Sequence, residues 1–425
     1  MSKVSVIMPS LNVAAYIERS LRSVMGQTMQ DLEILCIDAG SVDGTYEILE
    51  RLSREDSRVR VIRSDRKSYG YQVNLGIERA RGEYIGIVET DDHIDSGMYE
   101  TLYGEAASAG FPDIVKGGYR AYWTAHDGET VFKERRLSAD PAFYGRTVRP
   151  GDILSLASED WYLWSGIYKR SFICENGIRL SESPGAAFQD IGFLHRTNAA
   201  AESAVYTADC LYNYCIDREG SSSNSGKELG YAYYEFHALT RESWEEKAEQ
   251  ALYVRMAKSF VCCCRTFAEE RIADPVYRER YGWFTDRLGE AMSERKIGED
   301  SLPPGIHKRL QILLNSPDEV YRQYLHDHRH LYGETDGLQY VIFGCGDRGA
   351  AAFKKLCERQ GDILAFMDND AGLWGSRLEG VPILEPQVCL GENVRYIIAN
   401  EAHFDRIREQ LVELGVEREA IGVFW

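Results

Sequence analysis

Three acidic residues follow a short apolar run in the segment IGIVETDD, residues 85–92. Carboxylates this close repel one another unless a cation, a basic neighbour or water lies among them. Mg²⁺ and Mn²⁺ prefer carboxylate oxygens, and they are usually held by one or two acids together with a substrate phosphate. Glu89, Asp91 and Asp92 therefore favour a cation-assisted site, although a solvated turn would be the better interpretation for an isolated pair of acids.

The first third of the chain contains the elements that would position these acids. Short runs of β-branched and aromatic residues, typical of strands, occur at residues 4–8, 33–37, 59–62, 84–88 and 113–119. Between the first two runs, Ile17, Leu21 and Val24 recur at helical spacing. Strands that alternate with helices predict an α/β fold with a doubly wound, mostly parallel sheet.

Asp38 directly follows the second of these runs, as the acidic cluster follows the fourth. Ligands of doubly wound sheets bind at the carboxyl ends of the strands. We therefore expect Asp38 and the acidic cluster to meet at one edge of the sheet, where they would line a ligand site.

The composition is that of a soluble globular protein with two or three domains: of 425 residues, 44% are hydrophobic and 27% are charged. The net charge of −18 argues against binding to nucleic acid or to an anionic membrane surface. The ten cysteines show no paired zinc-ligand spacing, and the opening residues MSKVSVIMP contain neither a signal-peptide core nor a transmembrane segment. We expect a cytoplasmic protein whose contact with the inner membrane face would be peripheral.

Shifts in pattern divide the chain into three predicted domains, residues 1–225, 226–335 and 336–425. The segment DREGSSSNSGKE, residues 217–228, is polar and typical of a loop. Beyond it, residues 230–271 show a helical pattern in which Trp244, Ala248 and Leu252 recur every fourth residue. Further helices are predicted between prolines, and a new strand–helix–strand pattern begins after GETDG. The middle region is thus expected to be helical and the last domain to be a small α/β unit.

Six motifs occur in order over the first 225 residues: VSVIMPSLN, IDAGSVDGT, NLGIERARGEYIGIVETDD, WYLWSGIYKRSFI, FQDIGF and YNYCIDREGSSSNS. Together they closely resemble the family-2 glycosyltransferases of the A-type fold, as found among bacterial polysaccharide enzymes. The resemblance implies a nucleotide-diphospho-sugar transferase fold and an enzyme that moves a sugar from a nucleotide donor, expected to be UDP-linked, to a glycan or lipid-linked acceptor. The process that it implies is the synthesis of bacterial surface polysaccharides.

The resemblance implies roles for individual residues. Asp91 would ligate Mn²⁺ or Mg²⁺, which would neutralise the diphosphate leaving group. Glu89 or Asp92 would contact the ribose hydroxyls or water on that metal. Arg218 and Ser221 would belong to a lid that orders over the pyrophosphate, and a mobile linker is the alternative. The remaining donor-binding residues would line the nucleobase and ribose pocket: Pro9, Ser10, Leu11, Asn12, Asp38 and Asn74.

Asp190, in the motif FQDIGF, is the candidate general base. The resemblance implies that its carboxylate takes a proton from the acceptor hydroxyl, and a single base opposite the leaving group implies inversion of the anomeric carbon. The residues alone also allow a helix N-cap, which is compatible with the first role. Three positions depart from the common family pattern: Glu89 replaces the first acid of the DxD motif, Gln189 replaces a glutamate, and Ala39 replaces a second acid.

Four aromatic residues lie close together in the fourth motif, WYLWSGIYKRSFI: Trp161, Tyr162, Trp164 and Tyr168. They could stack on an acceptor sugar, or they could belong to the hydrophobic core. The sequence gives these two interpretations equal weight.

The predicted last domain contains a dinucleotide-binding pattern, in which Gly344, Gly346 and Gly349 lie between a strand and a helix. Asp368 ends the next strand at the position of a ribose-binding acid. The pattern resembles small Rossmann-like modules, and an NAD-type nucleotide is its candidate ligand, with a regulatory or packing role as the alternative. Two other functions stay open: a nucleotide-sugar oxidoreductase or epimerase acting through this module, and a non-catalytic binding protein with a degenerate transferase domain.

Overall fold

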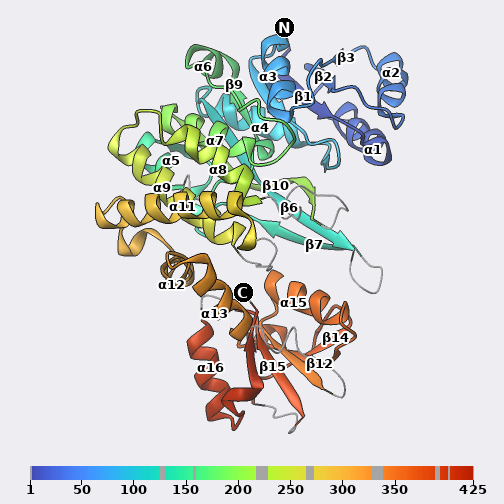
Figure 1. Ribbon diagram of the computed structural model, residues 1–425. Helices are drawn as coiled ribbons and strands as arrows, with labels where there is room; N and C mark the ends of the chain where they lie inside the picture. Colours follow the sequence, from blue (N-terminus) through green and yellow to red (C-terminus); the bar gives the residue numbers. More distant parts are fainter. Residues whose placement is uncertain are drawn as a thin grey trace. The chain divides into compact units, whose positions relative to one another are not determined.

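A computed structural model of the chain describes residues 2–124, 130–156, 159–216, 228–264, 272–327, 338–387, 393–400 and 403–424 (Figure 1). The chain forms two compact units, and the main division between them falls between Arg255 and Met256. The predicted limits of the three domains are not tested by this division and stay predictions.

The first unit is built on a ten-stranded sheet, in which eight strands follow the order β3-β2-β1-β4-β9-β6-β10-β5. Strands β1 to β4 are parallel neighbours that alternate with helices along the chain, which confirms the predicted α/β fold with a mostly parallel sheet. These strands are β1 (Val4–Ser10), β2 (Leu32–Asp38), β3 (Val59–Arg63) and β4 (Tyr84–Ile87), and the connecting helices are α1 (Ala14–Met25), α2 (Thr45–Glu55) and α3 (Tyr69–Arg79).

Strand β1 is buried on both faces of the sheet. Val6 and Met8 belong to the core cluster that contains the apolar face of α1, whereas Ile7 belongs to the cluster that contains the apolar face of α3. Successive side chains of a strand point to opposite faces, so a central strand covered by helices on both sides needs a continuous apolar run. This requirement explains why VSVIM is apolar at nearly every position.

The other half of the sheet is mixed. Strand β9 runs antiparallel to both β4 and β6, with Gly86 opposite Ile167 and Lys116 opposite Gly166. The amino end of β9 therefore lies at the carboxyl end of β4. The strands of this half are β5 (His93–Ile94), β6 (Ile114–Thr124), β7 (Thr130–Arg135), β8 (Thr147–Val148), β9 (Gly166–Lys169) and β10 (Ala204–Cys215). The helices are α4 (Met98–Ser108), α5 (Pro150–Leu156), α6 (Arg170–Glu175) and α7 (Gln189–Ala200).

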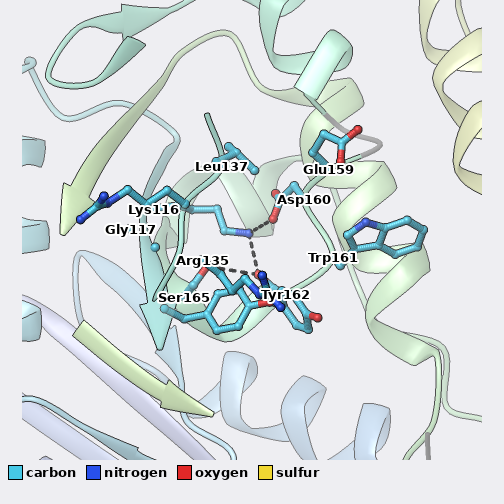
Figure 2. A pocket seen from close by; sticks show the side chains of 12 residues that line it. Lys116, Gly117, Arg135, Leu137, Glu159, Asp160, Trp161, Tyr162 and Ser165 are labelled. Carbon is cyan, nitrogen blue, oxygen red and sulfur yellow. Dashed lines mark hydrogen bonds and ion pairs between the residues drawn. The ribbon is translucent and has the colours of Figure 1, made fainter. Parts of the chain in front are cut away.

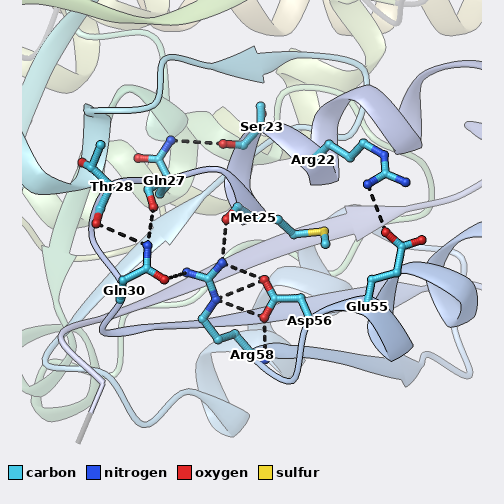
Figure 3. A network of polar contacts seen from close by, with 9 residues as sticks. All are labelled: Arg22, Ser23, Met25, Gln27, Thr28, Gln30, Glu55, Asp56 and Arg58. Atoms are coloured by element: carbon cyan, nitrogen blue, oxygen red, sulfur yellow. Dashed lines mark hydrogen bonds and ion pairs between the residues drawn. The ribbon is translucent and has the colours of Figure 1, made fainter.

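A polar network around Arg58 holds the carboxyl ends of α1 and α2 together (Figure 3). The Arg58 guanidinium donates to the carbonyl of Met25 at 2.6 Å and pairs with the carboxylate of Asp56 at 2.7 Å. Arg22, on α1, forms a second link to Glu55 at 3.1 Å. These contacts fix the two helices that follow β1 and β2 relative to each other.

Two helices follow the sheet, α8 (Glu228–Leu239) and α9 (Glu246–Cys263). The prediction of continuous helix from residue 230 is wrong between them, because the chain turns at residues 240–245. The Trp244 indole N–H donates to the carbonyl of Leu239 at 2.8 Å and so caps the end of α8. The four-residue recurrence of apolar side chains continues through Trp244 although the backbone does not.

The second unit begins with helices and ends with a smaller sheet. Helix α11 (Pro275–Ser293) lies wholly in this unit. The predicted breaks at Pro303-Pro304 and Pro317 are confirmed, because α12 (Pro304–Leu313) and α13 (Pro317–Asp327) each start at a proline. The sheet has the order β13-β14-β12-β11-β15-β16, and all neighbours except β13 and β14 are parallel. Its strands are β11 (Gln339–Phe343), β12 (Asp362–Met367), β13 (Arg377–Leu378), β14 (Val381–Leu384), β15 (Val394–Ile398) and β16 (Ile421–Val423), with helices α15 (Asp347–Cys357) and α16 (Phe404–Glu413). Over the described ranges, no helix has the length and hydropathy needed to cross a membrane.

Candidate active site

The loops after β1 and β2 are pinned to each other at the carboxyl edge of the large sheet. The Asn12 side chain, from a backbone with φ of +54°, accepts a hydrogen bond from the amide of Val42 at 2.9 Å. The Asn12 amide in turn donates to the Ser41 hydroxyl at 2.9 Å. Pro9 and Ser10 are buried beneath this contact, while Leu11 is half-buried and Asn12 is exposed. The four predicted residues 9–12 thus form one ledge with the loop that follows Asp38.

The carboxylate of Asp38 holds its own loop. Its side chain is only 1% exposed, and Oδ2 accepts from the amides of Gly40 and Ser41 at 2.9 and 3.0 Å. Oδ1 accepts from the Ser41 hydroxyl at 2.5 Å. Gly40 has a φ of +78°, which a side chain would strain. Asp38 lies at the predicted edge, but three donors of its own loop already occupy its oxygens.

The acidic cluster is joined to this ledge, because the Thr90 hydroxyl donates to the carbonyl of Pro9 at 2.9 Å. Glu89 is half-buried, and its Oε1 accepts a hydrogen bond from the Tyr69 hydroxyl at 2.5 Å. Asp91 is also half-buried, and its carbonyl accepts from Arg19 at 3.0 Å. As predicted, the acidic cluster after β4 and the loop after β2 therefore lie at the same edge of the sheet.

Asp92 points away from this edge into the interior. It is 1% exposed, and its two oxygens accept from the Tyr212 hydroxyl and the Cys215 amide, each at 2.9 Å. Burial and the neighbouring charge of Asp91 raise its pKa well above the ordinary value. The geometry does not support the expected contact between Asp92 and the donor, because both oxygens are committed to β10.

Asn74 also connects parts of the fold around the site. Its amide nitrogen donates to the Leu180 carbonyl at 3.0 Å and to Glu182 at 3.1 Å, and its oxygen accepts from the Leu180 amide at 3.0 Å. The side chain is buried and binds the segment before α7 to α3. The structure thus engages Asn74 with residues 180–182 rather than placing it at the floor of a nucleobase pocket.

Asp190 is the second residue of α7, so it lies in the first turn and is not the N-cap. The N-cap is Phe188, whose φ of +63° is unusual for a bulky residue. Gln189 fixes this turn: its Oε1 accepts from the Gly70 amide at 2.8 Å, and its nitrogen donates to the Ser183 hydroxyl at 2.7 Å. Burial raises the pKa of Asp190 to about 6, while the charge of Arg255 opposes the shift. A carboxyl group with this pKa is ionised at neutral pH and is still basic enough to accept a proton.

Tyr69 is the residue that the sequence did not reveal. Burial, together with the negative charges of Glu89, Asp190 and Asp91, raises the pKa of Tyr69 well above its usual range. Its hydroxyl is therefore a neutral donor that stands among the candidate base and two of the clustered acids. In the segment SYGYQVN, nothing in the local pattern distinguishes Tyr69 from Tyr71 as a site residue.

A buried charge network lies next to the base. Lys116 and Asp160 form an ion pair inside the fold, and the Lys116 ammonium also donates to the Tyr162 carbonyl at 2.6 Å (Figure 2). Arg255, fully buried on α9, donates to the Asp160 carbonyl at 2.9 Å. Burying these charges is costly unless they are paired. The sequence reasoning missed this network because its members come from three distant segments.

The aromatic cluster divides between the two predicted roles. Trp164 and Tyr168 are buried in the core, where Trp164 stacks on Tyr212 with ring centroids 4.0 Å apart. Trp161 and Tyr162 are half-buried and line a cavity (Figure 2). The core interpretation therefore holds for Trp164 and Tyr168, and Tyr162 also packs against the core cluster that contains Trp164.

The three clustered acids differ in how they could contact a metal ion. Within the ranges that the structure describes, no group of three or more His, Cys, Asp or Glu side chains is arranged to hold one. Because Asp92 is turned inward and Glu89 is engaged by Tyr69, Asp91 is the acid that fits the role. A single acid suits Mg²⁺ or Mn²⁺ when substrate phosphates and water complete the shell. The predicted lid residues Arg218 and Ser221 lie outside the described residues.

The glycine pattern of the second unit is explained in large part by packing. Gly344 has a φ of +115°, and a Cβ on Gly349 would lie 2.0 Å from the Gly344 carbonyl oxygen. The carboxylate of Asp368 accepts from the amides of Cys345 and Asp370, at 2.8 and 3.0 Å. The four predicted residues thus lie together around the start of α15, but the acid is bound to the glycine loop itself. Nucleotide binding at this loop stays a prediction.

Comparison with known proteins connects this geometry to a family. A family model described as glycosyl transferase family 2 matches residues 5–152. The glycosyltransferase GlyG of Streptococcus pneumoniae serotype 4 is 30% identical over 238 residues, which cover 54% of this chain and 75% of that protein. The chain belongs to glycosyl transferase family 2. It is therefore a glycosyltransferase, and the expected enzyme class is confirmed.

Other relatives of this family-2 glycosyltransferase extend the comparison. The uncharacterized glycosyltransferase EpsJ of Bacillus subtilis is 32% identical over 232 residues, covering 54% of this chain and 64% of that protein. The crystal structure of S. aureus TarS residues 1–349 in complex with UDP matches with a TM-score of 0.54 at 18% identity, covering 79% of this chain and 95% of that chain. This likeness shows a shared fold. A second family model, described as C2185-like, N-terminal, matches residues 338–422.

Proposed function

We propose that this glycosyltransferase inverts the anomeric carbon of a sugar that it moves from a UDP-linked donor to a glycan or lipid-linked acceptor in the synthesis of bacterial surface polysaccharides. The observation that carries the proposal is Asp190, a carboxyl group with a pKa of about 6 whose charge acts on Tyr69 beside the acids that follow β4. The UDP complex of TarS, a protein of similar fold, supports the nucleotide.

Asp190 would act as the general base. Its carboxylate removes the proton from the acceptor hydroxyl while that oxygen attacks the anomeric carbon from the side opposite the diphosphate. A positioned base of this kind contributes roughly 10²–10⁴-fold in rate. The buried Gln189 supports the role, because its contacts to Gly70 and Ser183 hold the first turn of α7 in place.

Asp91 would bind the diphosphate side through a divalent ion. When bound, Mg²⁺ or Mn²⁺ supplies positive charge to the departing diphosphate. The ledge of residues 9–12 and the loop after Asp38 would hold the nucleoside, with backbone groups as well as side chains. The contact between Thr90 and Pro9 supports this arrangement, because it ties the acidic cluster to that ledge.

The direct test is a thermal-shift screen of UDP, GDP and their common sugar conjugates, each with and without Mn²⁺, followed by a turnover assay with the best ligand. We expect a UDP conjugate to raise the melting temperature in a Mn²⁺-dependent manner, since stabilisation grows with ligand concentration over Kd. Stabilisation by no nucleotide at millimolar concentration, or release of no nucleoside diphosphate, would refute the proposal.

A further inference from the structure

A cavity of about 200 Å³ lies against the buried ion pair of Lys116 and Asp160 (Figure 2). Its walls come from β6, from the end of β7 and from the segment 159–165. Trp161 and Tyr162 contribute aromatic surface, and the charged residues Arg135, Arg136 and Glu159 also line the cavity. Concave sites with aromatic walls and a few well-placed polar groups are typical of small-molecule binding.

The cavity lies on the same edge of the sheet as the proposed donor site. Lys116 is opposite Gly166, and Ile167 is opposite Gly86, so the cavity residues of β6 stand level with the end of β4. The acidic cluster follows that end directly. The cavity is thus beside the position where a sugar would leave the diphosphate.

A chain of aromatic contacts links the wall of the cavity to the acidic cluster. Tyr162, on the cavity wall, contacts Trp164 with ring centroids 4.7 Å apart. Trp164 stacks on Tyr212 at 4.0 Å, and the Tyr212 hydroxyl donates to Asp92. Because Trp164 and Tyr212 are buried, these contacts can hold the cavity wall and the acidic cluster at a fixed separation.

The polar chemistry of the cavity suits a hydroxyl group. Asp160 is 4% exposed, and its Oδ1 is bound by Lys116. Its Oδ2 accepts no hydrogen bond from any part of the chain that the structure describes. A buried carboxylate oxygen without a donor is costly, and a ligand hydroxyl would remove that cost.

Trp161 supplies the apolar part of the site. Its ring is half-buried on the cavity wall, and the buried guanidinium of Arg255 lies 5.5 Å from the ring centre. This cation–π contact fixes the orientation of the ring. A ligand that presents hydroxyls at one edge and C–H groups on its face matches both the carboxylate and the indole. Monosaccharides are such ligands.

We propose that this cavity binds a monosaccharide unit of the acceptor, with a sugar hydroxyl donating to Asp160 and the sugar face lying on Trp161. The inference rests on the proposed function, because only that function makes the bound sugar an acceptor. Burial lowers the pKa of the Lys116 ammonium group, and Asp190 lies close enough for its negative charge to oppose that shift. Asp190 would accept the proton of the reacting hydroxyl at the opposite end of the bound sugar.

The test uses the full chain saturated with UDP and Mn²⁺, and three probes: the p-nitrophenyl glycosides of glucose, galactose and N-acetylglucosamine. Saturation-transfer NMR gives the Kd of each glycoside, and calorimetry gives the Kd of UDP. We expect at least one glycoside to bind, and Trp161→Ala to weaken it about tenfold or more. Trp161→Phe, which keeps an aromatic face, should stay within about threefold of the unaltered protein. Phe132→Ala is the control, because Phe132 is 54% exposed on β7 and does not line the cavity.

The outcomes separate the two proposals. Binding of none of the three glycosides, or equal binding by Trp161→Ala, overturns the cavity proposal. A parallel loss of UDP affinity in Trp161→Ala also overturns it, because the indole would then support the fold rather than the sugar. Glycoside binding that depends on Trp161 in a protein that turns over no nucleotide sugar would instead refute the proposed function and leave a sugar site.

Discussion

Asp190 gains its basicity from burial rather than from a neighbouring acid. Many members of the family have a glutamate where this chain has Gln189, yet burial alone raises the pKa of Asp190 to about 6, against the opposing charge of Arg255. A neutral neighbour is the better partner here, because Gln189 uses its nitrogen as a donor to Ser183 and a glutamate could not.

The pH dependence of turnover follows from this pKa. We expect kcat/KM to fall about tenfold per pH unit below about pH 6, because the base must be ionised before it can accept a proton. Asp190→Asn should lower kcat by roughly 10²–10⁴-fold and should leave UDP affinity unchanged, as measured by calorimetry. Retained turnover in this variant would remove Asp190 from the role of base.

Asp91 and Asp92 offer a matched pair of adjacent acids. We expect Asp91→Asn to lose the Mn²⁺ dependence of UDP binding, with affinity at least tenfold weaker in the presence of the metal, because Asp91 is the acid that fits metal binding. Asp92→Asn should keep that dependence, since Asp92 is committed to Tyr212 and Cys215. Calorimetry with and without Mn²⁺ measures both. The reverse assignment, with Asp92 controlling the metal response, would contradict the geometry.

At the scale of secondary-structure elements, the sequence predicted the strands well for a physical reason. A strand buried on both faces is a continuous apolar run, so VSVIM and EILCI could hardly form anything else, and both lie within β1 and β2. Helix ends were harder to predict. The turn at residues 240–245 depends on a hydrogen bond from Trp244 to Leu239, and the spacing of apolar residues contains no sign of it.

The candidate site could be predicted only as far as topology determines it. Strand order brings Asp38 and the acidic cluster to one edge, and this much follows from the alternation of strands and helices. The direction in which each side chain points depends on partners far along the chain. Asp92 turns inward because Tyr212 and Cys215 bind it, and Asn74 turns toward Leu180. No local pattern carries such information.

The second and third glycines of the pattern in the second unit, Gly346 and Gly349, should differ in their tolerance of a side chain. We expect Gly349→Ala to destabilise this unit by about 1–3 kcal/mol, because its Cβ would lie 2.0 Å from the Gly344 carbonyl oxygen. Gly346→Ala should cost much less, since no other heavy atom lies within 4 Å of its added carbon. Urea denaturation followed by circular dichroism compares them. Equal losses would mean that the packing at Gly349 does not determine the pattern.

At the scale of the whole molecule, buried carboxyl groups make stability depend on pH. Glu235, on α8, is 2% exposed, and burial raises its pKa to about 7. The unfolded chain releases this proton near its ordinary pKa of 4.5, before the folded chain does. The folded state therefore loses stability as the pH rises from about 4.5 to about 7.

Removing this charge should stabilise the protein at high pH alone. We expect Glu235→Gln to raise the free energy of unfolding by about 1–3 kcal/mol at pH 8, and to leave it unchanged at about pH 3, where both states hold the proton. Urea denaturation at the two pH values measures the difference. The exposed residue Glu78, changed to Gln, is the control. An equal effect of Glu235→Gln at both pH values would show that lost packing, not charge, is responsible.

The antiparallel insertion of β9 between β4 and β6 has a consequence for the order of folding. Residues 84–87 must wait for residues 166–169 before the middle of the sheet can close. Joining segments so far apart carries a loop-closure cost that local hairpins avoid. During synthesis on the ribosome, the ledge made by the first strands can therefore form early, while a competent catalytic centre must await the emergence of α7. A nascent chain would therefore complete the strands of the proposed nucleotide site before the proposed base, Asp190, is in place.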